Sequence, residues 1–218
     1  MADAELIISS KNYSSWSLRG FLLVRMSGLD FSERVIDPTD TAARDELLLR
    51  SSSTRIPCLV HGGFEIWDTL AIAEYLNELK PEAAMLPADR MARTRCRSVS
   101  GEMHSGFSAL RSTMPMNIRS HRPNFTVWSS AQADIDRIQQ IWRECLATWK
   151  GPYLFGAKIS VADMLYAPVV TRFQTYDVAL DGALAAYSRL ILAWPAMVEW
   201  AAAAKAEVEE VSELEVEF

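Results

Sequence analysis

The sequence contains few cysteines, and they are not arranged in pairs. Cys58, Cys96 and Cys145 are the only three in 218 residues, and no two of them form a C-x-x-C motif. A dithiol redox centre or a common zinc site would require such a pair, so the sequence predicts neither, and we expect no metal.

Basic residues are outnumbered by acidic ones. The chain has 22 Lys and Arg against 28 Asp and Glu, which gives a net charge of −6. A surface that binds nucleic acid needs an excess of positive charge, so we expect no nucleic-acid partner.

Long apolar runs are absent too. No stretch approaches the ~18 consecutive apolar residues of a membrane-spanning helix. Residues 1–5 lack the basic and apolar regions of a secretory signal. We therefore expect a cytoplasmic location and no membrane partner. The chain does have apolar content: 50% of its residues are hydrophobic, enough for a packed core in one large or two small domains.

The first half of the chain alternates short apolar runs with helical patterns. Leu6-Ile7-Ile8 is typical of a buried strand, and the following helix is expected to have Ser17 as its N-cap and Gly28 as its stop. Strands are then expected over residues 31–36 and on both sides of His61-Gly62-Gly63, and helices over residues 41–50 and 69–79. The resulting order, βαβαββα, predicts a mixed four-stranded sheet, because the last two strands form a hairpin.

The second half is helical throughout. A linker over residues 82–89, which contains Pro87, separates it from the first half. Helices are expected over residues 90–112, 132–149, 160–175, 184–192 and 195–205, followed by a solvated acidic tail over 207–217. We therefore predict an α/β domain over residues 1–81 and an all-α bundle over residues 90–218.

Two serines, Ser14 and Ser15, lie on the loop between the first strand and the first helix. A helix N-terminus directs free N–H groups and a partial positive charge at such a loop. Our hypothesis is that Ser14, with Ser15 as the second choice, holds a thiolate there. A hydroxyl that donates to sulfur favours ionisation of a thiol whose ordinary pKa is near ~8.5. The alternative is an ordinary helix-capping loop.

Two further features stand where elements begin. Pro57 opens the strand that follows residue 57, where proline is tolerated, and the Ile56–Pro57 bond can be trans or cis. Asp68 and Thr69 open the next helix. They either cap that helix or use its free amide and hydroxyl to bind a carboxylate.

Four segments, spread over nearly the whole chain, occur in the same order as the motifs of a known family. They are Tyr13-Ser14-Ser15-Trp16-Ser17-Leu18-Arg19, Arg55-Ile56-Pro57-Cys58-Leu59-Val60, Asp68-Thr69-Leu70-Ala71-Ile72-Ala73-Glu74-Tyr75-Leu76 and Gly156-Ala157-Lys158-Ile159-Ser160-Val161-Ala162-Asp163. Together they resemble motifs of the glutathione transferases, most closely of zeta-like and bacterial serine-type members. The last segment contains a capping box, Ser160 with Asp163, whose role is in folding.

The resemblance implies a thioredoxin-like N-terminal domain that binds glutathione, an all-helical C-terminal domain and a homodimer. It implies that Ser14 or Ser15 is catalytic, with Tyr13 as an alternative partner for the thiol. Glutathione ligands are implied at six positions: Ile56 and Pro57 along the peptide backbone, Asp68 and Thr69 at the γ-glutamyl end, and Arg55 and Arg19. Arg19 has the alternative of a purely structural role.

The second-substrate pocket is expected beside the helix over residues 90–112. Its candidates are Trp16, His104, Phe107 and Arg111, of which Arg111 would meet an anion. The alternative is that His104 is a surface residue and Phe107 a core residue.

The sequence departs from the zeta pattern at two places. Trp16 stands where zeta-type isomerases have cysteine, and Asp68-Thr69 replaces Glu/Gln-Ser with a shorter acid. We therefore expect a glutathione transferase that conjugates the thiol to a small hydrophobic or anionic electrophile. The alternatives are an isomerase of the maleylacetoacetate type, a glutathione peroxidase or disulfide reductase, and a non-catalytic binding protein on the same fold.

Overall fold

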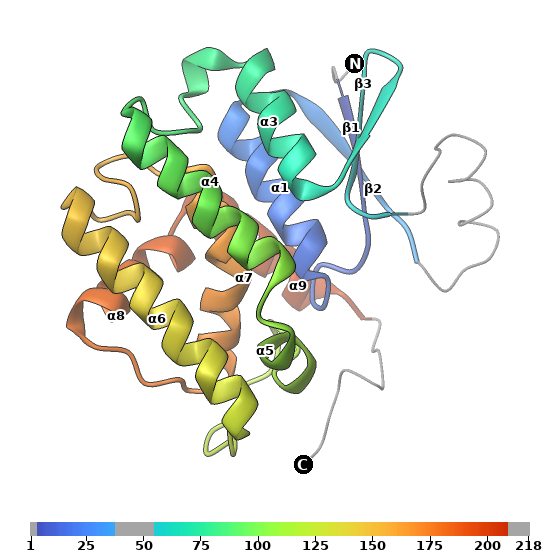
Figure 1. The fold of residues 1–218 in the computed structure, drawn as a ribbon. Helices are drawn as coiled ribbons and strands as arrows, with labels where there is room; N and C mark the ends of the chain where they lie inside the picture. Colours follow the sequence, from blue (N-terminus) through green and yellow to red (C-terminus); the bar gives the residue numbers. More distant parts are fainter. Residues whose placement is uncertain (1–3, 38–54, 209–218) are drawn as a thin grey trace.

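The computed structural model describes residues 4–37 and 55–208. Its sheet has four strands: β1 (Ala4–Ile8), β2 (Phe31–Val35), β3 (Cys58–His61) and β4 (Phe64–Trp67). They lie in the order β2-β1-β3-β4, with β1 parallel to β2 and antiparallel to β3, while β3 and β4 form an antiparallel hairpin (Figure 1). The predicted mixed sheet is confirmed; the helix predicted over residues 41–50 lies outside the described residues.

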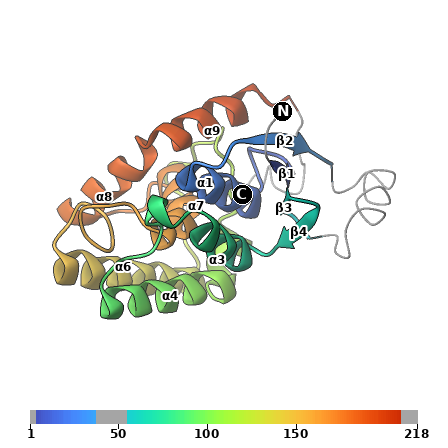
Figure 2. The same cartoon turned by 90° about the horizontal axis from the view of Figure 1, so that it is seen from above.

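The remaining secondary-structure elements of the described residues are helices, joined by loops. They are α1 (Ser15–Ser27), α3 (Thr69–Leu79), the short 3₁₀ helix η1 (Pro81–Ala83), α4 (Arg90–Ser105), α5 (Ser108–Thr113), α6 (Ser129–Trp149), α7 (Val161–Thr175), α8 (Gly182–Leu192) and α9 (Pro195–Ala206). In Figure 2, α7 lies in the middle of the helical half, with α9 on one side of it and α4 and α6 on the other. The predicted combination of a thioredoxin-like α/β part and an all-helical part is confirmed.

Helix α1 joins the two halves through a shared apolar core. It packs against α3 on the sheet side and against α7 in the helical half. Leu18 and Phe21 of α1 are buried in one large core, which also contains Leu6 and Ile8 of β1. Successive side chains of a strand point to opposite faces, so Ile7 instead joins a small cluster on the other face of the sheet.

Glycines end α1 and turn the hairpin as the sequence predicts. Gly28 has φ +74°, and its N–H donates to the carbonyl oxygen of Arg25. Gly62 and Gly63 have φ values of +58° and +81° between β3 and β4. These left-handed conformations carry no side-chain clash in glycine, which explains why the elements stop at these residues.

Two local predictions are wrong. The helix expected over residues 90–112 is two helices, because the chain leaves α4 at Gly106 in an extended conformation and Phe107 adopts φ +58°. A Cβ at Gly106 would lie 2.7 Å from the Glu102 carbonyl oxygen, so glycine permits this break. The N-cap of α1 is Ser14 and not Ser17: the Ser14 hydroxyl accepts a hydrogen bond from the Ser17 N–H at 3.2 Å.

Helix α7 begins with the predicted capping box. The Asp163 carboxylate is fully buried and accepts hydrogen bonds from the N–H and the hydroxyl of Ser160, both at 2.7 Å. It also accepts one from the N–H of Leu154 at 3.1 Å, which ties the preceding loop to the helix. The start of the most deeply buried helix is therefore fixed by one carboxylate.

Candidate functional site

A cavity of about 240 Å³ lies where the start of α1, the start of α3 and the end of α4 approach the residues before β3. Its volume is below the ~300–1,000 Å³ of typical ligand pockets. Seven residues line it, and all seven were predicted as site residues from the sequence: Trp16, Arg55, Ile56, Pro57, Asp68, Thr69 and His104.

Asp68, Thr69 and His104 form one side of this cavity. The Asp68 carboxylate caps α3 by accepting from the Leu70 N–H at 2.8 Å, and its other oxygen lies 3.2 Å from Nε2 of His104. Nδ1 of His104 lies 3.4 Å from the Thr69 hydroxyl. This geometry suits the tautomer in which Nε2–H donates to Asp68 and Nδ1 accepts from Thr69. His104 therefore links the end of α4 to the start of α3.

The segment before β3 supplies the opposite wall. The Ile56–Pro57 peptide bond, which the sequence left open, is cis. Behind Pro57 lies Gly20 of α1: a Cβ at position 20 would be only 2.7 Å from the Cβ and Cγ atoms of the proline ring. Glycine at this position is what allows α1 to approach the cavity wall so closely.

Trp16 lines the cavity and contacts one histidine and two arginines. Its ring centroid is 5.1 Å from that of His104, in an edge-to-face arrangement. The guanidinium groups of Arg19 and Arg111 lie 4.7 and 4.6 Å from the same indole ring, within cation–π distance. A large ring therefore lines the cavity at the position where the zeta-type motif would have a cysteine.

Arg19, Arg111 and Arg172, which we call the arginine cluster, gather behind this ring. Arg19 donates to the Leu165 carbonyl oxygen at 2.7 Å, and Arg172 donates to that of Met114 at 2.9 Å. Burial lowers the pKa of all three, and it lowers that of Arg172 to about 10.

The cluster has no acidic partner within the described part of the chain. Within the described residues its hydrogen bonds all go to backbone carbonyls, and Nη2 of Arg19 is buried without a partner. Guanidinium groups keep their charge at neutral pH. The arginine cluster therefore makes the surroundings of Trp16 electropositive, which favours an anion nearby.

The two serines begin α1 in different ways. Besides capping the helix, the Ser14 hydroxyl donates to the Ser17 hydroxyl at 2.8 Å. The Ser15 hydroxyl makes no hydrogen bond within the described ranges, and the N–H groups of Ser15 and Trp16 have no carbonyl partner there. The start of α1 thus presents one free hydroxyl and two free amides, a suitable set of donors for an anion.

Five predicted site residues do not line the cavity: the two serines, Ser14 and Ser15, which precede and begin α1 next to Trp16, and Phe107, Arg19 and Arg111. Phe107 is 7% exposed and belongs to the large core, so the sequence alternative of a core residue describes it. Arg19 is 1% exposed and binds α7, as its structural alternative stated. Arg111 is half-buried, donates to the carbonyl oxygen of His104 at 3.0 Å and reaches the site only through Trp16.

Reasoning from the sequence missed three residues around the site. Gly20 and Arg172 have no local pattern that distinguishes them from other helix residues. Glu207, expected in a solvated tail, instead binds the loop that precedes Ser14 through hydrogen bonds from the N–H groups of Lys11 and Asn12. Nothing in an acidic run indicates that its first member makes such a contact.

None of the three cysteines lines the cavity. All three are buried, and burial raises the pKa of the Cys96 thiol to about 12 and that of Cys145 to about 11. A buried thiol with a raised pKa is a poor nucleophile. Among the residues that the structure describes, no group of His, Cys, Asp or Glu is arranged to hold a metal, and no helix is long and apolar enough to span a membrane.

Comparison with known families decides the identity of this fold. The sequence profile of the glutathione S-transferase N-terminal domain matches residues 13–79, and that of the glutathione S-transferase C-terminal domain matches residues 91–203. The chain belongs to the glutathione S-transferase family. The prediction of a glutathione transferase that uses glutathione as its co-substrate is confirmed at the level of this family.

Relatives of this transferase carry two names. Maleylacetoacetate isomerase of Rattus norvegicus is 27% identical over 184 residues, which cover 83% of this chain and 84% of the relative. Glutathione S-transferase 1 of Dianthus caryophyllus is 27% identical over 168 residues, which cover 76% and 75%.

Solved structures agree with the transferase fold. A glutathione transferase homolog from Burkholderia, with bound glutathione, has a TM-score of 0.72 at 23% identity, over 94% of this chain and 99% of that one. Glutathione transferase Omega 3C from Trametes versicolor has a TM-score of 0.71 at 16% identity, over 92% and 89%. At these identities the likeness concerns the fold alone.

Proposed function

We propose that this protein activates the thiol of glutathione through a serine hydroxyl at the start of α1 and conjugates it to a small electrophile. The observation that carries the proposal is the cavity itself. It combines the Ile56–Pro57 backbone, the Asp68–Thr69 start of α3 and the Trp16 end of α1 in one site. An extended tripeptide with a carboxylate at each end and a thiol on its central residue suits such a set of groups.

Thiolate formation is the chemical contribution of the site. A free thiol with a pKa near ~8.5 is only about 3% ionised at neutral pH, and each unit of depression corresponds to about 1.4 kcal/mol. The free amides of Ser15 and Trp16 and the arginine cluster all favour the negative charge on sulfur. The same positive field suits an anionic electrophile.

Two serines compete for the contact with sulfur. The family motif favours Ser14, whereas the hydrogen bonds favour Ser15, since the Ser14 proton is already donated to Ser17. We propose Ser15 as the donor and Ser14 as the cap that orients it. Ser14 takes the role only if its hydroxyl rotates away from Ser17 when glutathione binds.

Separate Ser14→Ala and Ser15→Ala variants test this assignment with glutathione and an aryl halide. We expect Ser15→Ala to lower kcat/KM at least about tenfold at neutral pH with an unchanged melting temperature, which matches the loss of about one unit of thiol pKa depression. We expect Ser14→Ala mainly to lower stability, by about 1 kcal/mol, as the loss of an N-cap does. Full turnover in Ser15→Ala, together with loss of turnover in a stable Ser14→Ala, would reverse the assignment. Full turnover in both variants would end the serine proposal.

Isomerisation of maleylacetoacetate is a second candidate, favoured by the names of several relatives. It uses the same thiolate, but Trp16 replaces the cysteine of the zeta motif and lines the cavity with a large ring. Turnover of maleylacetoacetate by the wild-type protein, measured beside the conjugation assay, distinguishes the two activities.

The assembly and location of the protein are further parts of the proposal. We propose a homodimer in the cytoplasm, on the basis of family membership. Light scattering of the purified protein at assay concentration tests the dimer directly, and a monomer of full activity would contradict it.

A further inference from the structure

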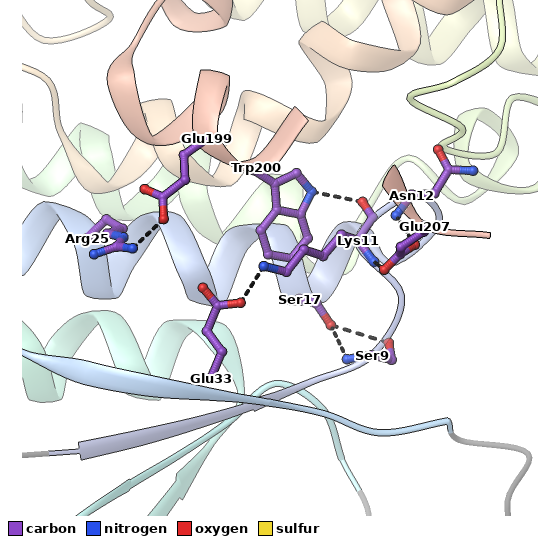
Figure 3. A network of polar contacts seen from close by, with 9 residues as sticks. All are labelled: Ser9, Lys11, Asn12, Ser17, Arg25, Glu33, Glu199, Trp200 and Glu207. Atoms are coloured by element: carbon purple, nitrogen blue, oxygen red, sulfur yellow. Dashed lines mark hydrogen bonds and ion pairs between the residues drawn. The ribbon is translucent and has the colours of Figure 1, made fainter. Parts of the chain in front are cut away.

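The loop before α1, residues 10–14, is held by the last described helix of the chain. Figure 3 shows Trp200 of α9 beside Lys11, with the indole N–H donating to the Lys11 carbonyl oxygen at 2.8 Å. The Lys11 ammonium forms an ion pair with Glu33 of β2 and lies 5.3 Å from the Trp200 ring centroid. The loop is therefore fixed on one side by a side chain that the sequence places far away.

Glu207, the residue that follows α9, binds the opposite side of this loop (Figure 3). One carboxylate oxygen accepts from the Lys11 N–H at 2.5 Å. The other accepts from the Ser10 hydroxyl at 2.7 Å and from the Asn12 N–H at 2.9 Å. Hydrogen bonds to an ionised acceptor are shorter and stronger than neutral ones, and these are partly buried from water. A single carboxylate thus organises the backbone of the loop.

This arrangement is transmitted directly to the serines. The Ser10 hydroxyl, oriented by Glu207, lies 3.2 Å from the N–H of Tyr13, and the Ser14 N–H donates to the Ser10 carbonyl oxygen at 3.1 Å. The turn therefore runs without interruption from the Glu207 contacts to the N-cap of α1. A change at Glu207 alters the direction in which Ser14 and Ser15 enter the helix.

A second set of hydrogen bonds joins the loop before α1, the residue after α9 and the segment that contains Arg119. The Glu207 carbonyl oxygen accepts from Arg119 at 2.6 Å, and the same guanidinium donates to the Tyr13 hydroxyl at 2.9 Å. The Asn12 side chain is fully buried, donates to Asn117 at 2.9 Å and accepts from the Arg119 N–H at 3.0 Å. The loop is thus enclosed by polar contacts that a solvated tail would not make.

We propose that Glu207 is a positioning residue for the thiol site: it orients the hydroxyl and the amides at the start of α1 toward the sulfur of glutathione without touching the substrate. This inference rests on the proposed function, because it assigns Glu207 a part in thiolate stabilisation. The carboxylate form is required, since an amide in its place presents an N–H group to at least one of the three donors.

The test compares Glu207→Gln with Glu199→Gln. Glu199 lies on α9, the helix that Glu207 follows, and pairs with Arg25 of α1 at an exposed position, so its substitution makes the same charge change away from the loop. We expect Glu207→Gln to speed amide hydrogen exchange at residues 10–13 at least tenfold, while the control stays at the wild-type rate. We also expect Glu207→Gln to move the rising limb of the pH profile of kcat/KM to higher pH, with a threefold or larger loss at neutral pH.

A purely structural role would lower the melting temperature without moving the pH profile. If the wild-type protein turns over glutathione and the pH profile of kcat/KM is the same in Glu207→Gln, the positioning role is overturned. Unchanged exchange at residues 10–13 also overturns it, because the contact would then not hold the loop. If Glu207→Gln does not fold, Glu207→Asp keeps the charge on a shorter stem, and the same shifts, smaller in size, are expected. Absence of turnover in the wild-type protein overturns the proposed function itself, whereas the exchange measurement still reports on the contact.

Discussion

Replacing Asp163 with alanine removes the carboxylate on which the start of α7 depends. Two buried backbone donors, the N–H groups of Leu154 and Ser160, lose their acceptor, and so does the Ser160 hydroxyl. Leaving a buried donor without a partner costs about 1–3 kcal/mol. Two such donors give a gross cost of about 2–6 kcal/mol.

The net cost is smaller than this sum. Burial raises the pKa of Asp163, against the effect of its hydrogen bonds, so part of their contribution is offset by the cost of burying the charge. We expect a net loss of about 3 kcal/mol, which corresponds to a fall of roughly 6–12 °C in the melting temperature of a chain of this size. A carboxyl whose folded pKa is raised stabilises most in acid. The difference in free energy of unfolding between wild type and variant should therefore become smaller as pH rises through that pKa.

Thermal unfolding followed by circular dichroism measures this loss. The control is Asp89→Ala, which removes an exposed N-cap carboxylate from α4 and should cost only about 1 kcal/mol. If Asp163→Ala melts no lower than the control, the argument from unsatisfied buried donors is wrong. If the gap widens with rising pH, the sign of the electrostatic offset is wrong.

Two further predictions concern side-chain space and thiol chemistry. Gly20→Ala should lower the melting temperature and raise the KM for glutathione, because the new Cβ meets the Pro57 ring at 2.7 Å. By contrast, Gly101→Ala inside α4, with open space around it, should stabilise by up to about 1 kcal/mol; equal stabilisation by both changes would show that the ring yields freely. Cys96 and Cys145 should resist a thiol reagent in the native protein at neutral pH, because burial raises their pKa values to about 12 and about 11 and thiolate appears only as pH approaches these values. Mass spectrometry after brief labelling checks this, and rapid native modification of either would contradict it.

Local patterns explain why much of the fold was predictable. Gly28, Gly62 and Gly63 mark turns that require positive φ, and Ser160 with Asp163 marks a helix start by spacing alone. Six of the seven cavity residues were predicted because they occur in motifs at the start of an element; the seventh, His104, was predicted from its place on the helix expected to pass the site. Elements whose ends carry their own chemistry can be located without knowledge of the rest of the structure.

Contacts between distant segments explain what was missed. Gly106 interrupts the helical pattern, but nothing local marks the positive φ of Phe107 that starts a second helix, nor the hydrogen bond from Arg111 to the end of α4. Ser14, and not Ser17, caps α1. The Ser17 hydroxyl instead accepts a hydrogen bond from the N–H of Ser9 at 3.0 Å. None of these partners is marked by a neighbouring residue in the sequence.

The hydrogen bonds that Trp200 and Glu207 form with the loop before α1 have a consequence for the synthesis of the chain. Asn12 and Glu207 are separated by 195 residues. At synthesis rates of about 5–20 residues per second, roughly 10–40 s pass between the appearance of the loop and that of its carboxylate. During that interval the sheet and α1 can form, but the N–H groups of Lys11 and Asn12 remain hydrated. The contacts of this loop are thus completed only when the end of α9 leaves the ribosome.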